Sequence, residues 1–412
     1  MLCGVSAFIG VMASLLATLL KHLTEHYEER LFARAGMQPL LYLLFPAIGL
    51  VLILLLRSYV FRKKENKGIK EVLDSTKSGR RIPSYKIASH FVNGLLTVSF
   101  GGSTGIEVST VVSSAAIGSL AQQRQPLFRK YGTELICAGI AAGVTALFAS
   151  PLAGLFFAWE VIYKRTGRMF IATVVPAVAA ATLFLELLGE APVFSLHITQ
   201  WHLYALPYFI LLGVVCGINA VYLTRCVLFI KSVFAKIKAA HYRIALAAII
   251  IGLMVMALPQ LYGDGYHALK HFFAGANSMA YSPLLVLSLL GIVLLKPIIT
   301  SVTLSGGGDG GVFAPGLFIG AFLGLLIALV LNTFFDAGVI PLNFMAAGMA
   351  AMLSASIHAP LTALFLTCSL TGGYTLFVPL LTATLVARYT AKTIYPYNVY
   401  TYPVAAYASQ KD

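Results

Sequence analysis

The sequence predicts an all-α integral membrane protein. Of its 412 residues, 59% are apolar and only 11% are charged, and the mean hydropathy is +0.86. Soluble proteins carry about 25% charged residues, so most of this chain must be solvated by lipid. Long apolar runs recur from one end of the chain to the other, which favours a single membrane domain over residues 1–412.

Six of these runs are predicted to be membrane helices, because crossing the apolar core of a bilayer takes about 20 helical residues. They cover residues 5–20, 39–56, 170–188, 203–223, 244–261 and 283–299. The first run has neither a basic flank nor a small-residue cleavage site, so we expect it to be retained as a membrane helix.

Four other apolar segments are short or interrupted by glycine, and we expect them to form broken or re-entrant helices. They are residues 100–118, 139–160, 305–320 and 346–370. Non-helical backbone at membrane depth is stable only where protein or a water-filled cavity covers it. These segments are therefore candidates for the lining of a transport path.

The chain contains an internal repeat. Residues 138–160 align without a gap with residues 347–369, at an offset of 209 residues, and two glycine-rich breaks correspond at the same offset. Matching interrupted helices are typical of duplicated transporters, whose substrate lies near the interface of the halves. We expect the halves to cover about residues 1–195 and 200–400.

The formal charge of +14 indicates which loops face the cytoplasm rather than a nucleic-acid partner, because the basic residues lie between the apolar runs. Ten of them fall between Arg57 and Lys86. The positive-inside rule makes this loop cytoplasmic, in a multi-pass protein of a cell membrane such as the bacterial inner membrane. The five cysteines are scattered without CxxC spacing, so we expect no disulfide framework, metal site or cofactor.

The glycine-rich breaks favour an anion as the substrate. Helices are predicted to begin after residues 66–68, 101–105 and 306–311. A helix that begins inside the membrane directs unpaired N–H groups and the positive end of its dipole into the cavity. Several such ends can hold a small anion, whereas a cation site would need carboxylates that these segments largely lack.

Four segments carry a resemblance to a known family, in the order in which that family has them. They are GGVFAP (310–315), FASPLAGLFFAWE (148–160), GIEVSTV (105–111) and AKTIYPY (391–397). The chain resembles the CLC chloride channels and proton-coupled anion exchangers. The resemblance implies 16 to 18 helices in two inverted halves and a homodimer with a pore in each subunit.

The resemblance also implies a set of site residues. The backbone N–H groups of Val312 and Phe313 lie in the family's GxFxP motif and would contact the anion, and Tyr395 would be the coordinating tyrosine. Two further breaks would contribute Gly68 and Ile106. Glu107 would be the gate: it is the only acid between His90 and Gln123, and its carboxylate can occupy the place of the anion.

The chain departs from the family at three places. The anion-coordinating serine is Lys67 in this chain, and Val108-Ser109 replaces a usual Gly-Pro. At the intracellular proton-transfer position, where typical exchangers have a second glutamate, this chain has Val161. Because a valine side chain cannot titrate, this position predicts the loss of the inner proton relay.

Each of these residues could also have a purely structural role. Lys67 is either a cation at the inner mouth or a solvated member of the basic run. Glu160 is either an inner-mouth acid or, as we favour, a helix-end residue paired with Lys164. Glu107 could simply fix packing, Tyr395 could belong to an interfacial tyrosine belt, and the pair His267 and His271 lacks a clear third metal ligand.

The predicted function is therefore a passive, glutamate-gated channel or uniporter for chloride or a similar inorganic anion. A proton-coupled anion antiporter is the alternative. An intramembrane enzyme is a distant third possibility, since its best nucleophile and base would be Ser354 or Ser356 with His358.

Overall fold

The computed structural model is all-α, and it describes residues 1–62, 66–123, 126–165, 167–194, 196 and 198–402. No β-strand occurs within these ranges. The one β-type contact is an isolated antiparallel bridge between Gly105 and Gly311.

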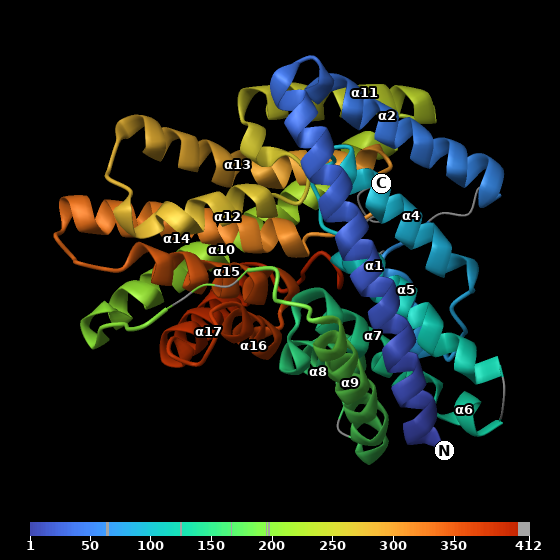
Figure 1. The fold of residues 1–412 in the computed structure, drawn as a ribbon. Coiled ribbons are helices and arrows are strands. Elements are labelled where there is room, and N and C mark those ends of the chain that lie inside the picture. The colour runs from blue at the N-terminus through green and yellow to red at the C-terminus, as the bar shows by residue number, and fades with distance from the viewer. Residues whose placement is uncertain (63–65, 124–125, 166, 195, 197, 403–412) are drawn as a thin grey trace.

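The helices are uneven in length, as the broken apolar pattern predicts (Figure 1). Their bounds are α1 Leu2–Met37, α2 Leu41–Leu55, α3 Ile69–Ser78, α4 Tyr85–Ser99, α5 Glu107–Leu120, α6 Pro126–Lys130, α7 Gly132–Phe148, α8 Pro151–Phe157, α9 Arg168–Leu188, α10 Leu206–Ala235, α11 Ala240–Ala257, α12 Tyr266–Gly275, α13 Pro283–Gly306, α14 Phe313–Phe334, α15 Pro341–Ile357, α16 Pro360–Leu370 and α17 Phe377–Ile394. Short π-helical turns extend α2 over Leu56–Val60 and α8 over Ala158–Tyr163.

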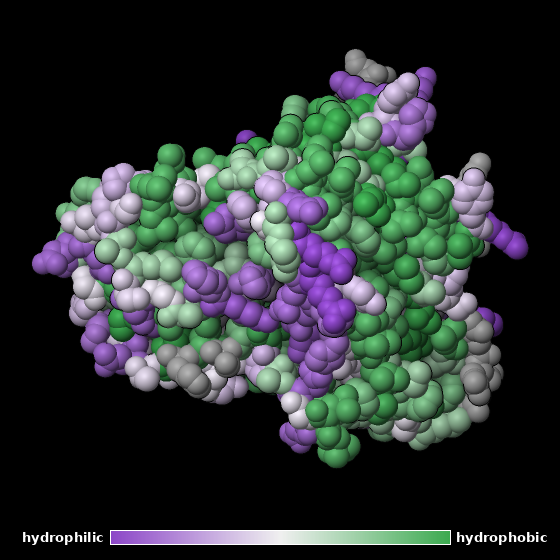
Figure 2. Space-filling view, turned by 45° about the horizontal axis from the view of Figure 1, so that its top comes forward, coloured by the Kyte–Doolittle hydropathy of each residue, from purple (hydrophilic) through white to green (hydrophobic). Residues whose placement is uncertain are grey.

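Seven helices in the described ranges are long and apolar enough to cross a membrane. The six predicted runs lie in or overlap α1, α2, α9, α10, α11 and α13. The seventh is α14, which is interior: 89% of its apolar window is buried inside the protein, against 28 to 50% for the other six. Figure 2 shows wide apolar surfaces with hydrophilic residues gathered in a band between them, as expected of a protein surrounded by lipid.

The predicted interruptions are confirmed as real helix ends. Non-helical segments at residues 100–106 and 307–312 separate α4 from α5 and α13 from α14, and two-residue kinks separate α7 from α8 and α15 from α16. Both kinks use a non-glycine residue in the left-handed region, Ala149 with φ 49° and His358 with φ 59°. These two residues are 209 positions apart, so the backbone repeats at the offset that the sequence predicts.

Side chains at matching positions of the repeat also meet. The rings of Phe156 in α8 and Phe365 in α16, again 209 positions apart, stack at 4.9 Å with an angle of 9°. Ser369 donates a hydrogen bond of 2.8 Å from its hydroxyl to that of Ser150 beside this stack. Contacts between equivalent helices support the interpretation that the chain is an internal duplication.

The two sets of helices lie side by side in Figure 1, with α4, α5 and α7 to α9 on one side and α10 and α12 to α17 on the other. α5 packs on α4 and α7, and α14 packs on α15. The first residues of α5 and α14 meet between the two sets, where the Gly105–Gly311 bridge lies. The molecule thus brings two interior helix N-termini together near its centre.

Candidate anion site

Three helices begin where the glycine-rich and polar breaks predicted. α3 begins after Gly68, α5 after Ile106 and α14 after Val312. None of these N-cap residues offers a side-chain hydrogen bond to its helix. The first backbone N–H groups of each helix therefore remain available to a ligand.

The three N-termini converge on Val108. Gly68 has φ 60° and faces Val108 so closely that a methyl group at position 68 would lie 3.3 Å from Val108 Cγ1. Gly311 packs against the other methyl group of the same valine. A larger residue at either glycine would separate the helix ends. The Val108 side chain fills the space between Gly68 and Gly311, and so between the starts of α3 and α14.

The break before α14 is held against the break before α5. The Thr104 hydroxyl donates a 2.8 Å hydrogen bond to the carbonyl of Gly311. Behind the start of α14, the ring of Phe313 stacks on that of Phe148 at 5.3 Å, at the end of α7. Packing and hydrogen bonding therefore fix where the Phe313 N–H points.

Glu107 occupies this meeting point. It is the first residue of α5 and is 3% exposed. One carboxylate oxygen turns back over Gly105 toward Ala314 at the start of α14, and it has no hydrogen-bond partner among the described residues. A carboxylate between two helix N-termini lies where a bound anion would be stabilised by the same N–H groups and dipoles.

The other oxygen of Glu107 has a partner that the sequence did not reveal. The hydroxyl of Tyr266, the first residue of α12, donates a 2.7 Å hydrogen bond to Glu107 Oε1. Tyr266 is 159 positions away from Glu107, and no motif surrounds it. Only the tertiary structure brings it to Glu107.

The tyrosine hydroxyl beside Gly311 is that of Tyr400, whereas the sequence led us to expect Tyr395 there. Tyr395 ends α17 with its ring against Arg225, Tyr397 and Tyr402. The hydroxyl of Tyr400 lies 3.7 Å from where a methyl group on Gly311 would be. It is buried and has no hydrogen-bond partner among the described residues, so it is free to donate to an anion.

A turn built by Asn398 positions Tyr400. The Asn398 carboxamide accepts hydrogen bonds from the N–H groups of Tyr400 and Thr401, at 3.0 and 2.9 Å. Its amide nitrogen donates 2.9 Å to the carbonyl of Ile357, the last residue of α15. The sequence signal for Tyr400 was the possible turn Asn-Val-Tyr-Thr after α17. Four tyrosines lie close together in this segment, so the sequence did not show which of them faces the interior.

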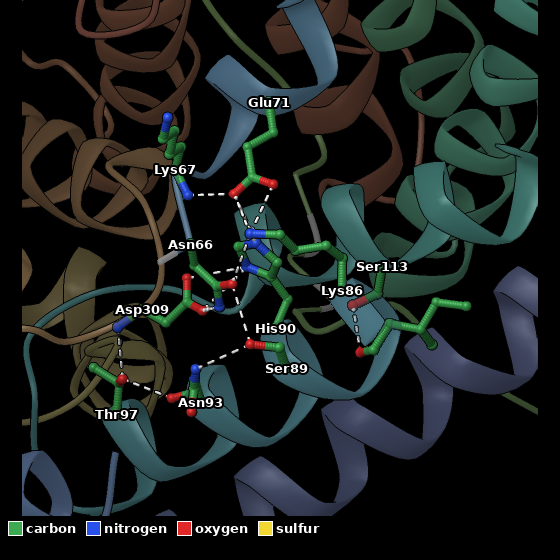
Figure 3. A network of polar contacts seen from close by, with 11 residues as sticks. Asn66, Lys67, Glu71, Lys86, Ser89, His90, Asn93, Thr97, Ser113 and Asp309 are labelled. Atoms are coloured by element: carbon green, nitrogen blue, oxygen red, sulfur yellow. Dashed lines mark hydrogen bonds and ion pairs between the residues drawn. The ribbon is translucent and has the colours of Figure 1, made fainter. Parts of the chain in front are cut away.

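Lys67 contributes its backbone rather than its charge. Its side chain is exposed and directed away from the buried polar groups in Figure 3, while its N–H donates to the Glu71 carboxylate. The solvated interpretation of Lys67 is the one the geometry favours. Gly68, next to it, is the residue of this break that touches α5.

A buried polar network lies beside the start of α3, and the Lys67 side chain is not part of it (Figure 3). His90 of α4 is fully buried, with Nδ1 3.1 Å from the Asp309 carboxylate and Nε2 3.7 Å from that of Glu71. Lys86, one turn earlier, lies 2.9 Å from Glu71. Asn66 accepts a 3.2 Å hydrogen bond from Lys86 and donates one to Asp309.

This network joins α3, α4 and the loop that precedes α14. The Asp309 N–H is also fixed, donating 2.9 Å to the Thr97 hydroxyl. Two carboxylates beside a lysine and a histidine satisfy one another's charges, which is how ionic groups survive burial. The sequence offered a signal in Asp309, an acid inside the glycine-rich break, but none that paired it with His90.

Glu160 is not paired with Lys164 among the described residues, and it has a partner that the sequence did not indicate. Its carboxylate accepts hydrogen bonds from the N–H groups of Leu361 and Thr362, at 3.1 and 2.8 Å, and from the Thr362 hydroxyl at 2.8 Å. It thus caps the N-terminus of α16 across the repeat, and no ion pair with Lys164 occurs among the described residues. The neighbouring Val161 is buried at 4% exposure.

The enzyme interpretation has no supporting geometry in the described ranges. The Ser354 hydroxyl donates to the carbonyl of Thr384 and that of Ser356 to the carbonyl of Leu353, so neither bonds to His358. Likewise, no group of three or more potential metal-ligating side chains gathers around His267 and His271 within the part of the chain that the structure describes.

The model of the voltage-gated chloride channel family matches residues 48–392. The chain belongs to this family, the CLC family. Curated CLC relatives include the voltage-gated ClC-type chloride channel ClcB of Escherichia coli O17:K52:H18 (strain UMN026), 30% identical over 316 residues that cover 74% of this chain and 72% of ClcB. The ClcB of Escherichia coli strain K12 / DH10B gives the same identity and coverage.

Solved CLC structures share the fold. A slow cyanobacterial Cl⁻/H⁺ antiporter has a TM-score of 0.85 at 22% identity, covering 100% of this chain and 99% of its own. A CLC-type fluoride/proton antiporter has a TM-score of 0.81 at 26% identity, covering 97% and 96%. The chain is thus a multi-pass CLC anion transport protein with the predicted fold class, rather than a member of an enzyme family.

Proposed function

We propose that this CLC protein exchanges a small inorganic anion for protons, with Glu107 as the gate. The observation that carries the proposal is the position of the Glu107 carboxylate, between the N-termini of α5 and α14. The site residues are Gly68, Ile106, Val312 and Phe313 through their helix starts, and Tyr400 through its hydroxyl.

The gate works by competition. The ionised carboxylate takes the helix N-termini that an anion would otherwise use, because both are stabilised by the same dipoles. When the carboxyl group is protonated it loses its charge and this advantage, so the anion can replace it. Protonation and anion binding are then linked at one place.

Two observations favour proton coupling over passive flow. Both of the solved relatives described above are named as antiporters, one of chloride and one of fluoride. In addition, the His90 network contains titratable groups beside α3. These groups could hold a proton in the interior although Val161 cannot. Glu71 and His90 are the candidates for that role.

A passive uniporter is the second candidate. Val161 is buried and cannot titrate, and Glu160 is engaged in capping α16. If the His90 network serves only to position α3 and α14, the protein has no inner relay and anions move without a fixed proton stoichiometry. Chloride and fluoride are both suitable test anions, since they carry the same charge and the helix N-termini stabilise either one.

The deciding experiment is a reversal potential measured in liposomes that contain only this protein. With anion and proton gradients opposed, an antiporter gives a reversal potential that shifts with pH at fixed anion concentrations. A potential that follows the anion gradient alone would establish the uniporter. Chloride, fluoride, nitrate and bicarbonate should each be tested, with pH recorded simultaneously.

Glu107→Gln is the matched variant for this assay. It removes the charge and keeps the shape, so we expect anion flux to be retained or raised, its pH dependence to weaken and proton coupling to be lost. Abolished anion flux in folded protein would contradict the gate. Glu186→Gln, at an exposed position near the end of α9, controls for the removal of an acid away from the site.

We further propose that two copies associate in a cell membrane, each with its own site, and that the loop from Arg57 to Lys86 faces the cytoplasm. Family membership supports the dimer, and the basic composition of the loop supports its side.

A further inference from the structure

The contact between Tyr266 and Glu107 connects the gate to a cavity. A cavity of about 360 Å³ lies between the polar end of α1 and α12, and Tyr266 forms part of its wall. Its floor includes the buried residues Glu28 and Asp264, whereas Glu29, His267 and Lys270 at its rim are exposed. The phenol therefore has the gate on one side and a solvent-accessible space on the other.

This cavity opens on the side of the membrane opposite to the basic loop. The apolar part of α1 is followed by its polar end, and α2 then returns across the membrane to Arg57. The polar end of α1 and the loop that begins at Arg57 are thus separated by one membrane crossing. With the basic loop in the cytoplasm, the cavity is external.

Tyr266 is held rigidly. Its N–H donates 2.8 Å to Asp264 Oδ1, and its ring packs edge-on against Phe194 at 5.1 Å. The preceding loop is anchored by the fully buried Lys296, which donates hydrogen bonds of 3.3 and 3.1 Å to the carbonyls of Leu261 and Gly263. These contacts fix the backbone and ring of Tyr266 while its hydroxyl donates to Glu107.

We propose that Tyr266 is the external latch of the gate: its hydroxyl holds the ionised Glu107 carboxylate in the anion path and sets the external pH at which the path opens. The inference rests on the proposed gating role of Glu107. A hydroxyl that donates to a carboxylate stabilises the ionised form, so the latch favours the closed state. Tyr266 acts through Glu107 and is a positioning residue.

Other titratable and charged groups face this pair and belong to the same equilibrium. Asp264 lies in the loop before α12, Glu28 comes from α1, and Tyr400 from the turn after α17. Lys296 of α13 interacts in turn with Asp264 and Glu28. Because a substitution of Asp264, Glu28 or Lys296 would alter several of these interactions at once, Tyr266 itself is the residue to change.

The test is the dependence of anion flux on external pH in oriented liposomes, with internal pH fixed. In Tyr266→Phe the ionised carboxylate loses a charge-assisted donor, so the pH of half-maximal flux should rise by about one unit. Tyr262→Phe is the matched control: Tyr262 lines the same cavity, but its hydroxyl donates 2.9 Å to the Ser99 carbonyl. Its midpoint should equal that of the wild type.

Replacing Tyr266 by 3-fluorotyrosine strengthens the donor and should move the midpoint to lower pH, a result that also decides the question if Tyr266→Phe does not fold. The latch is overturned if Tyr266→Phe titrates like the wild type, if the fluorinated protein shifts upward, or if the shift follows internal pH instead. Failure of the gate itself is distinguishable, because Glu107→Gln would then keep the wild-type pH profile.

Discussion

At the scale of single residues, some members of the proposed site would act through the charge of a side chain and others through the position of their backbone. Glu107 is the only acid between His90 and Gln123, and it is buried at the start of α5, which is why we propose that its carboxylate competes with the anion. Lys67 has the opposite outcome: its charge is exposed, and its position matters because Gly68 follows it. Whether a charged residue such as Lys67 takes part in a site through its charge therefore depends on where its side chain lies in the structure.

The choice between two tyrosines is a residue-scale prediction. Tyr400→Phe removes a buried donor that faces the anion path, so anion affinity should fall by about 1.5 to 3 kcal/mol, or roughly tenfold or more. Tyr395→Phe, whose ring lies against Arg225, should leave the affinity unchanged. Calorimetric titration of the two purified variants with anion measures the difference, and equal affinities for both would remove Tyr400 from the site.

At the scale of elements, helix ends do most of the functional work. α5 and α14 begin beside the Glu107 carboxylate, at the proposed anion site, and α16 has its N-terminus capped by Glu160. A carboxylate is stabilising at both kinds of helix end, because N–H groups and the dipole favour negative charge there. At α16 the Glu160 carboxylate accepts three hydrogen bonds, whereas at α5 one oxygen of Glu107 has no partner among the described residues.

The cap of α16 leads to a stability prediction. Glu160→Ala leaves the N–H groups of Leu361 and Thr362 without their acceptor, which should lower the free energy of unfolding by about 1 to 2 kcal/mol. Thermal unfolding in detergent measures this loss. Lys164→Ala serves as the control and should unfold like the wild type. If Glu160→Ala is as stable as the wild type but loses proton coupling, Glu160 is a relay after all.

At the scale of the whole molecule, the repeat explains why the site lies where it does. The kinks at Ala149 and His358 and the stacked pair Phe156 and Phe365 all recur at 209 positions. α5 and α14, which correspond at this offset, begin on either side of the Gly105–Gly311 bridge, so their N-termini are brought together near the centre.

Topology is the prediction that belongs to this scale. In a background without the five native cysteines, Lys77→Cys in the basic loop and Lys270→Cys at the rim of the cavity place thiols at two exposed positions. A membrane-impermeant thiol reagent added to intact cells should label position 270 and reach position 77 only after permeabilisation. The reverse pattern would make the basic loop external and the Tyr266 cavity cytoplasmic.

The sequence by itself determined the membrane class, the broken helices, the repeat and the three helix starts after Gly68, Ile106 and Val312. These are local properties: apolar length decides solvation by lipid, and glycine or polar breaks end helices whatever the fold. Glu107 could be found in the same way, because an acid within an apolar stretch stands out without knowledge of its neighbours.

Only the tertiary structure decided which side chains meet across long separations. Tyr266 reaches Glu107 over 159 positions, Asp309 reaches His90 over 219, and Glu160 reaches Thr362 over 202. Nothing local distinguishes Tyr400 from Tyr395, since the direction of each ring depends on the Asn398 turn and its bond to α15. The hydrogen-bond partners of a buried polar group are set by packing, which a linear pattern of residues does not encode.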